Sequence, residues 1–543
     1  MIKTIAGEMS SQGNEDEEIQ SGPNSRYFSE SIGRCDCDSL PSEVLVHVLE
    51  LVTESTWKDG LLDGPSPSEM GTFPDGGMID NGLRSQDEAY ERAALYPKLF
   101  LIVCKRWSAI TLNTPILWSY LSITDATTSN FISISLRRST SLPLSIRFHT
   151  LSQMTGTKSF MIELENLLPG ILNLRLGNNT SEEDGAEDSS PDFDENILLL
   201  LQHAGRWKRF LLLAAHPQSI HRAAFLAADN NCQLRHLEEY RLQAIVRHKE
   251  IFNVPWRRRI WNARGKSPFF DRAMPLLHKM ALSRGVLPIT FHSNSIHLIQ
   301  DMFPALKELQ LVKMGGMPLI SLFNILVGLP TLYTLEIVET HFEVEGLEYF
   351  QRIKLLELKE FTAISLGGAT LACLFCAVSM PNVQSLSIIK TGSLDSLIRE
   401  IKEASLFPNV QNLTLDSEGG FEEMTKLCSA MPKVVSVHFI VEVHYQGLLG
   451  FQWRFLDNPM LSNFSLSGFK GEDIILFVET RREAGIPVNM LRIAKSSITC
   501  GDVSVNHGDS LRDLVGFLSW FDTAWKDVED EFYANLLPCA NRS

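Results

Sequence analysis

The stretch Leu99–Leu121, LFLIVCKRWSAITLNTPILWSYL, carries the clearest local pattern in the chain. Its apolar residues recur at helical spacing as far as Ile110, which predicts one amphipathic helix. The Asn-Thr-Pro sequence that ends at Pro115 terminates this helix, because proline disfavours the helical conformation for the residue before it. A second tryptophan, Trp118, follows the break.

A second predicted helix begins upstream, in the segment Leu40–Leu45, LPSEVL. Ser39 is a suitable N-cap, because its hydroxyl can accept a hydrogen bond from a backbone N–H of the first helical turn. The apolar face of this helix consists of Val44, Leu45, Val48, Leu49 and Val52. The sequence therefore predicts two amphipathic helices separated by a long connection.

Together the two helices resemble the F-box family, whose pattern is LPxE(V/I)L, then VC(K/R)xW, then a proline and an LW pair. The matching segments, in the same order, are Leu40–Leu45, Val103–Trp107 and Pro115–Trp118. One departure is an insertion at about 55–90, which is rich in Gly, Pro, Ser and Asp. Such a segment can bury little apolar surface and is expected to be a surface loop.

The resemblance implies docking on the Skp adaptor, which holds the cullin and RING subunits of an SCF ubiquitin ligase. Carried over by motif position, the candidate Skp-binding residues are Leu40, Pro41, Val44, Leu45, Val48, Cys104, Arg106, Trp107 and Trp118. Some of them must pack the small F-box core, with Trp107 the first choice for that role. Leu40 and Pro41 are the first choice for the interface.

The composition is that of a globular protein, with 44% hydrophobic and 21% charged residues. The net charge of −16 argues against a general nucleic-acid or anionic-membrane binder and leaves room for basic partners. No run of eighteen apolar residues predicts a membrane span, and the amino terminus lacks a secretion signal. We therefore expect a cytoplasmic or nuclear location, or both.

From about Leu168 onward a nine-residue phrase recurs, of the form apolar-Pro-x-apolar-x-x-apolar-x-apolar, with Phe303–Leu311 as the clearest copy. Each phrase predicts a proline that ends a helix, followed by a short strand with one buried face. Further copies begin at Leu168, Ala204, Met274, Leu329, Phe350, Met380, Phe407, Met431 and Asn458, with a poor copy at Asn231–Glu239. From Met274 the spacing is that of leucine-rich repeats, although no asparagine follows the strands regularly.

The predicted fold class is therefore α/β, with a small helical F-box followed by a leucine-rich-repeat-like solenoid of short parallel strands and helices. The expected organisation is a disordered acidic tail at 1–38, the F-box at 39–119, the solenoid at 120–510 and capping helices at 511–543. After the F-box come the segments Leu117–Ile123 (LWSYLSI), Leu136–Ser139 (LRRS) and Leu142–Phe148 (LPLSIRF). This order resembles a group of F-box proteins common in mushroom-forming fungi, which implies a fungal source.

Two charged segments interrupt the repeats. The acidic segment at 181–195 is expected to be a solvated loop, with a docking strip for a basic partner as the alternative. The basic cluster Trp256, Arg257, Arg258 and Arg259 could contact a phosphorylated or acidic substrate, because arginine pairs bidentately with phosphate. A nuclear-import signal, a nucleic-acid contact or a structural packing role are its other interpretations.

The sequence offers no pattern for catalysis or for a cofactor. Walker, GxSxG, HExxH and dinucleotide motifs are absent. A lone CxxC at Cys373 and Cys376 lacks the second ligand pair that a zinc site needs, so we predict neither a metal nor a cofactor. A binding protein is favoured over an enzyme.

The sequence thus predicts a non-catalytic substrate adaptor of an SCF-type ubiquitin ligase, whose repeats bind a protein substrate. Three alternatives stay open. The F-box could bind the Skp adaptor without a cullin and act as a scaffold, or it could be vestigial, with the repeats acting alone. The third alternative is a repeat-fold enzyme or nucleic-acid binder centred on Trp256–Lys266.

Overall fold

The structure of the chain is a computed structural model. The residues that it describes are 40–62, 97–124, 127–150, 191–214, 219–220, 222–223, 226, 232–244, 273–283, 296–314, 317–343, 352–404, 406–417, 421–440, 458, 460–467, 469, 471–494, 511–512 and 514–521. The chain divides into two compact units, Met1–Leu49 and Glu50–Ser543. The predicted tail at 1–38 lies outside the described residues.

The described part of the first unit is the start of helix α2 (Ser42–Leu62), which continues into the second unit. The N–H of Leu45 donates to the carbonyl of Pro41 over 3.1 Å, and the helix begins at Ser42, three residues after the predicted N-cap Ser39, which lies outside the described residues. The predicted surface loop at 55–90 is wrong at its start, because the helix extends to Leu62. A buried Trp57 explains the extension, since it gives the last turns of the helix an apolar contact with Tyr120.

The predicted single helix over Leu99–Ile110 is two helices, α4 (Lys98–Val103) and α5 (Lys105–Asn113). They are separated at Cys104, whose backbone is extended and whose Sγ accepts a hydrogen bond from the Trp107 N–H over 3.4 Å. This sulfur cap satisfies one of the N–H groups that a helix start leaves open. Helix α5 ends at Asn113, before Pro115, as predicted. Pro115 opens the 3-10 turn η2 (Pro115–Trp118).

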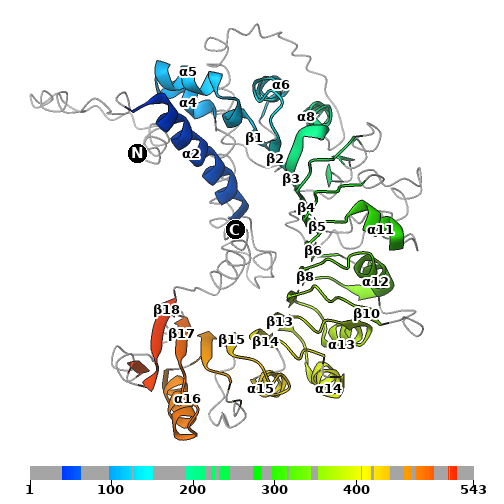
Figure 1. Cartoon of the computed structure of the whole chain (residues 1–543), viewed down its shortest axis with the longest axis vertical. Coiled ribbons are helices and arrows are strands. Elements are labelled where there is room, and N and C mark those ends of the chain that lie inside the picture. The colour runs from blue at the N-terminus through cyan, green and yellow to red at the C-terminus, as the bar shows by residue number, and fades with distance from the viewer. Residues whose placement is uncertain are drawn as a thin grey trace, which may run out of the picture. The chain divides into compact units, whose positions relative to one another are not determined.

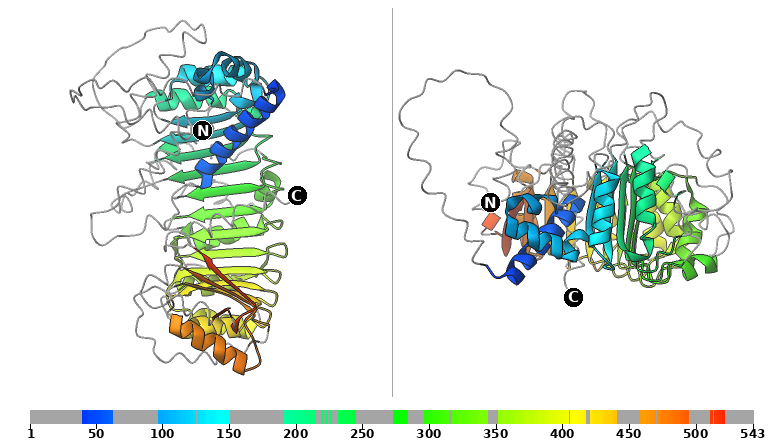
Figure 2. Two further views of the ribbon diagram at one scale, coloured as in Figure 1. Left: turned by 90° about the vertical axis from the view of Figure 1, so that its left-hand side faces the viewer. Right: turned by 90° about the horizontal axis from the view of Figure 1, so that it is seen from above.

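A fourteen-stranded sheet, parallel throughout, forms the body of the second unit. Its strands pair in the order of the chain and stack alongside one another (Figure 2). They are β1 (Tyr120–Thr124), β2 (Leu144–Thr150), β3 (Trp207–Ala214), β4 (Glu239–Ala244), β5 (Lys279–Ser283), β6 (Glu308–Val312), β8 (Thr334–Val338), β11 (Glu360–Ile364), β13 (Ser385–Thr391), β14 (Asn412–Ser417), β15 (Ser436–Ile440), β16 (Asn463–Ser467), β17 (Met490–Ala494) and β18 (Phe517–Phe521). Two short parallel pairs stand apart from it, β7 (Met317–Pro318) with β9 (Phe342–Glu343) and β10 (Ile353–Lys354) with β12 (Val378–Ser379).

The helices that connect the strands lie on one face of this sheet, which we call the helix face (Figure 1). They are α6 (Ser129–Arg138), α8 (Pro191–Leu201), α11 (Ile296–Met302), α12 (Leu319–Val327), α13 (Gly368–Ala377), α14 (Asp395–Ala404), α15 (Phe421–Ser429) and α16 (Gly471–Glu483), with the 3-10 turn η3 (Ala204–Arg206) before β3. Aromatic rings join the two layers, for example Phe361 with Phe375 at 5.4 Å between centroids. The chain is therefore a mixed α/β protein with a large parallel sheet, which fits the predicted class.

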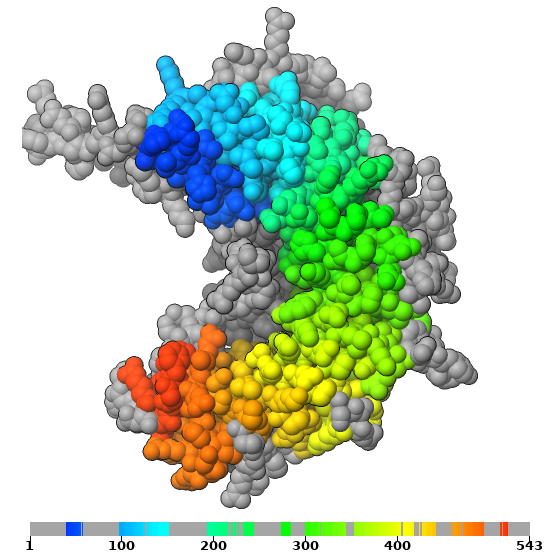
Figure 3. All heavy atoms as spheres, in the orientation of Figure 1, coloured from blue at the N-terminus to red at the C-terminus, as the bar shows by residue number. Residues whose placement is uncertain are grey.

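The hydrophobic core is one continuous layer between the strands and these helices, running from Leu121 on β1 to Val515 before β18. A complete phrase supplies four buried positions, as Phe303, Leu306, Leu309 and Leu311 show. Successive turns of the chain therefore pack side by side in sequence order (Figure 3). One turn alone could not bury its apolar face, so the turns stabilise one another.

Two copies of the phrase were assigned in the wrong frame. The copy placed at Phe350 predicted a strand ending near Leu358, whereas β11 begins at Glu360. Its buried positions are Leu355, Leu358, Phe361 and Ala363. The poor copy at Asn231–Glu239 belongs three residues later, where the buried positions are Leu234, Leu237, Tyr240 and Leu242. In its correct frame the first copy has Ala363 at a strand position and the second has Tyr240, and neither copy has a proline at the second position.

The predicted ends of the repeat region also need correction. The copy at Leu168 lies outside the described residues, and β2 pairs directly with β3 in the sheet. The predicted C-terminal capping helices give way to strand β18 at Phe517–Phe521, while 522–543 are not described. The acidic segment at 181–195 is helical from Pro191. The carboxylate of Asp194 accepts three hydrogen bonds from Arg222, two from Nε and the shortest from Nη2 at 2.5 Å.

A left-handed backbone occurs directly after three strands, β6, β8 and β11, and at one residue inside β13. Asparagine and glycine adopt this conformation more easily than other residues. The four positions are Lys313, Glu339, Ser365 and Lys390, with φ between 51° and 53° except for Glu339 at 44°. Residues other than asparagine thus adopt the left-handed backbone at these positions, which fits the lack of a regular asparagine after the strands.

Candidate functional site

An exposed apolar stripe runs along the first half of α2. Val44, Val48 and Leu51 lie one helical turn apart on one side of the helix, and Leu40 precedes them. These four side chains are 38–52% exposed, whereas Leu45 on another side of α2 is 1% exposed. An exposed apolar stripe beside a buried one is the pattern of a helix that contacts a partner as well as its own core.

A second exposed apolar pair lies on α4, where Ile102 and Val103 are 38% and 50% exposed. Cys104 directly after them is also exposed, and Arg106 is half-buried. The sequence placed Ile102 and Val103 on the same stripe as Trp107, and missed their exposure, because it predicted one uninterrupted helix. The extended residue Cys104 rotates the two segments relative to each other.

The two tryptophans of the motif are core residues. Trp107 is buried and lies edge-on to Phe100 at 5.9 Å between ring centroids. Trp118 is 0% exposed, and its Nε1–H donates to the carbonyl of Thr111 over 2.7 Å. Trp118 therefore ties α5 to the start of the sheet.

Of the nine candidate Skp-binding residues, the structure places five at the surface: Leu40, Pro41, Val44, Val48 and Cys104. Arg106 is intermediate. Leu45, Trp107 and Trp118 are buried, so these three belong to the part of the set that was expected to pack the core. Trp107 was already the first choice for the core.

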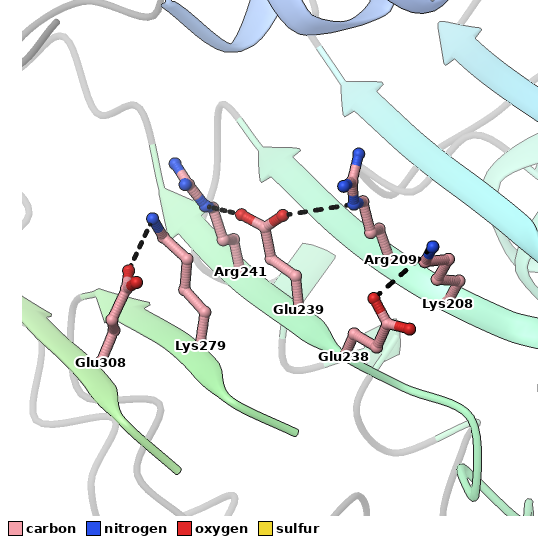
Figure 4. Close-up of polar contacts among 7 residues, drawn as sticks. All are labelled: Lys208, Arg209, Glu238, Glu239, Arg241, Lys279 and Glu308. Atoms are coloured by element: carbon pink, nitrogen blue, oxygen red, sulfur yellow. Dashed lines mark hydrogen bonds and ion pairs between the residues drawn. The ribbon is translucent and has the colours of Figure 1, made fainter. Parts of the chain in front are cut away.

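The face of the sheet opposite the helix face, which we call the polar face, carries a row of paired charges (Figure 4). Arg209 on β3, Glu239 on β4, Lys279 on β5 and Glu308 on β6 are cross-strand neighbours in register. The Arg209–Glu239 and Lys279–Glu308 ion pairs measure 3.8 and 2.8 Å. Arg241, also on β4, pairs with Glu239 at 2.7 Å.

The neighbouring cations decide how Glu239 titrates. Burial alone would raise the pKa of its carboxyl, but Arg241, Lys279 and Arg209 together hold that pKa below its ordinary value. The carboxylate therefore stays ionised and forms ion pairs with cations of the row. This part of the polar face is a row of three cations and two carboxylates in which every charge has an ion-pair partner.

Glu336, on β8, is in the opposite situation. It is 8% exposed, and its Oε1 has no hydrogen-bond partner anywhere in the part of the chain that the structure describes. Burial raises its pKa to about 7, against a side-chain hydrogen bond from Gln310 and the more distant charges of Lys279 and Arg241. Its register neighbours are Gln310 on β6 and Thr362 on β11.

The last turns of α2 pack over the first strands of the polar face within the second unit. Trp57 is buried there against Tyr120 on β1, with the guanidinium groups of Arg147 and Arg209 at 5.4 and 5.7 Å from its ring. A cation over an indole face is attracted to it. The indole of Trp57 therefore joins the last turns of α2 to the polar face of β1, β2 and β3.

The remaining sequence candidates are the basic cluster and the CxxC pair. The basic cluster Trp256–Arg259 lies outside the described residues. Cys373 and Cys376 on α13 are free thiols, and the described residues contain no group of His, Cys, Asp and Glu that could hold a metal ion. Burial and the Glu400 carboxylate raise the pKa of Cys376 to about 11, so its thiol is protonated near neutral pH.

No known family model matches the chain, and no curated protein matches it. Among the helices whose residues are described, none has both the length and the apolar content needed to cross a membrane.

Proposed function

We propose that this chain is the substrate-recognition adaptor of an SCF-type ubiquitin ligase. In this proposal residues 39–119 act as an F-box that docks on the Skp adaptor, and through it on the cullin and RING subunits. The repeats then form a leucine-rich-repeat-like solenoid that binds a protein substrate, in the cytoplasm, the nucleus or both. The chain performs no chemistry itself and contributes proximity and orientation.

The observation that carries the proposal is the exposed apolar stripe Leu40, Val44, Val48 and Leu51 on the helix with the LPxEVL motif. Ile102 and Val103, which open the second motif, add a further exposed apolar pair. Fully burying a side chain of this kind contributes about 1.5–3 kcal/mol. Since roughly 40–50% of each remains exposed, each would contribute about 1 kcal/mol on docking.

The test is co-purification of the full-length chain with the Skp adaptor. We expect Val44→Glu with Val48→Glu to weaken binding at least about 30-fold, because about 2 kcal/mol of apolar contact is lost and two carboxylates enter an apolar interface. Leu40→Ala with Pro41→Ala should weaken it in the same direction. The matched control is Leu476→Glu on α16, which places a charge at an equally exposed leucine on another helix.

Unchanged binding by both double variants would argue against this interface. Blotting the same material for the cullin separates a ligase from an F-box scaffold that has no cullin. A chain that binds the Skp adaptor without the cullin would be that scaffold.

A further inference from the structure

The helices at the start of the sheet follow one another along the chain, with α5 before β1, α6 before β2 and α8 before β3 (Figure 1). Helix α5 carries Arg106 and Trp107 of the proposed docking motif, whereas α6 and α8 connect strands of the sheet. The last four C=O groups of a helix have no partner within the helix, so the groups that bind them show how the helix is held. The contacts at these helix ends join α5 to the sheet.

An indole holds two of these helices in the same way. The Nε1–H of Trp118 donates to the carbonyl of Thr111 near the end of α5, over 2.7 Å. The Nε1–H of Trp207 donates to the carbonyl of Leu200 near the end of α8, over 3.2 Å. In both pairs the donor lies seven residues after the acceptor and close to the start of a strand. Helix α5 therefore stands in the same relation to β1 as α8 does to β3.

An arginine from further along the chain also binds the end of α5 and the end of α6. Nη1 of Arg138, the last residue of α6, donates to the carbonyl of Leu112 in α5 over 2.8 Å. The guanidinium of Arg206, in η3 before β3, donates to the carbonyl of Leu136 in α6 over 3.3 Å and to the hydroxyl of Ser139 over 2.7 Å. A cation at a helix C-terminus is stabilised by the partial negative charge of the unpaired carbonyls. The two arginines thus tie α5 to α6 and α6 to the start of β3.

We propose that Arg138 is a positioning residue that makes α5 the first helix of the repeat stack, so that the docking motif on α5 and the first strands move as one rigid body. Its guanidinium also lies over the ring of Trp118, 5.3 Å from the centroid, so it contacts both the end of α5 and the indole that holds it. The carbonyls of Ile110 and Thr111 are bound by Thr114 and Trp118, from the segment that directly follows α5. Arg138 differs from these two donors because it lies beyond β1, and it therefore links α5 to the next helix of the fold.

The link extends to the exposed apolar pair on α4. The ring of Phe100 on α4 lies edge-on to Trp107 on α5, so Ile102 and Val103 are attached to the same packed assembly. A path of contacts thus runs from α4 through α5 and α6 to β3. The consequence for activity rests on the proposed function, in which a fixed geometry between docking motif and repeats holds the substrate in one orientation to the ligase.

The experiment is amide hydrogen exchange of the full-length chain without a partner, because elements that open together share one opening free energy. The variant Arg138→Met removes the charge and the N–H donors and keeps most of the length of the side chain. Arg137→Met is the matched control, since Arg137 is the neighbouring arginine of α6 and its side chain is exposed. Arg138→Lys keeps the charge and an N–H donor and is the conservative variant.

In the wild-type chain we expect the slowest amides of α5, α6 and β1 to share one opening free energy. In Arg138→Met the amides of α5 should exchange at least about 10-fold faster and those of β1 and β2 less than about 2-fold faster, because the lost charge-assisted hydrogen bond holds only α5. Arg137→Met should leave α5 unchanged, and Arg138→Lys should recover most of its protection. Unchanged protection of α5 in Arg138→Met, an equal acceleration of α5, β1 and β2, or the same effect from Arg137→Met would overturn the inference. Failure of the wild-type chain to bind the Skp adaptor would instead refute the proposed function and leave the exchange result standing.

Discussion

Replacing Glu336 by glutamine should stabilise strand β8 only above about pH 5. The folded protein holds the Glu336 proton up to a pKa of about 7, whereas the ordinary value of 4.5 applies to the unfolded chain. Between these pH values the unfolded state binds fewer protons than the folded state, so the free energy of unfolding decreases as the pH rises. One pKa unit corresponds to about 1.36 kcal/mol, so the rise from 4.5 to about 7 lowers stability by about 3 kcal/mol at pH 8.

Amide hydrogen exchange is the suitable assay, because a chain of stacked turns opens locally and β8 must be observed on its own. The opening free energy of β8 peptides is compared between wild type and Glu336→Gln from pH 4.5 to pH 8, with exchange rates corrected for their intrinsic pH dependence. We expect near equality at pH 4.5 and a gain of about 3 kcal/mol for the variant at pH 8. A difference that is the same at every pH would refute the reasoning, because the stability cost would then not come from ionising Glu336.

Three further predictions concern other turns of the fold. Burial and the charge of Arg492 lower the pKa of His438 on β15 to about 4. As the pH falls from 6.5 to 4, hydrogen exchange should therefore show that β15 loses about 3 kcal/mol of opening free energy. The variant His438→Asn should not show this loss, and a loss that persists in the variant would contradict the assignment to His438. The variant Trp118→Phe removes the hydrogen bond to the Thr111 carbonyl and part of a buried ring, so hydrogen exchange should show α5 destabilised by about 2–3 kcal/mol. A change below about 0.5 kcal/mol would show that this hydrogen bond contributes nothing. Ser365→Gly relieves a left-handed backbone with φ 53° and should raise the opening free energy of β11 by about 0.5–1 kcal/mol, a sign that a strain-free turn would not give.

The α/β class could be predicted because the repeated phrase contains both a helix-ending proline and a short strand with one apolar face. A buried i, i+2 pair such as Leu309 and Leu311 can only be the inner face of a strand, and that strand needs neighbours to cover it. Where a copy kept the proline at its second position, the frame was right in every copy that the structure describes. Where Tyr240 or Ala363 stood at a strand position, size and polarity masked the pattern and the frame was wrong.

The ends of the sheet were harder to predict, because strand and helix share short apolar runs. Phe517–Phe521 has apolar residues on both faces and matched a helical spacing equally well. The break at Cys104 was equally hidden, since an extended single residue between two helices leaves no composition signal. It decides the candidate site, because it exposes Ile102 and Val103 while Trp107 stays buried.

The charged row could not be found from the sequence, because its members come from four strands whose register is set only by the folded sheet. Glu239 and Glu308 are 69 positions apart, yet both contact cations within the same row. Glu336 is separated from its neighbours in the same way. What distinguishes it is burial, which depends on the packing around it and not on its local sequence.

The most direct test of the account is hydrogen exchange of the full-length chain with and without the purified Skp adaptor. The account predicts a stable complex in which the amides of Ser42–Leu51 and Lys98–Val103 exchange more slowly, with the strands β4–β17 unaffected. Absence of a complex at tens of micromolar protein, or a complex that protects neither segment, would contradict it.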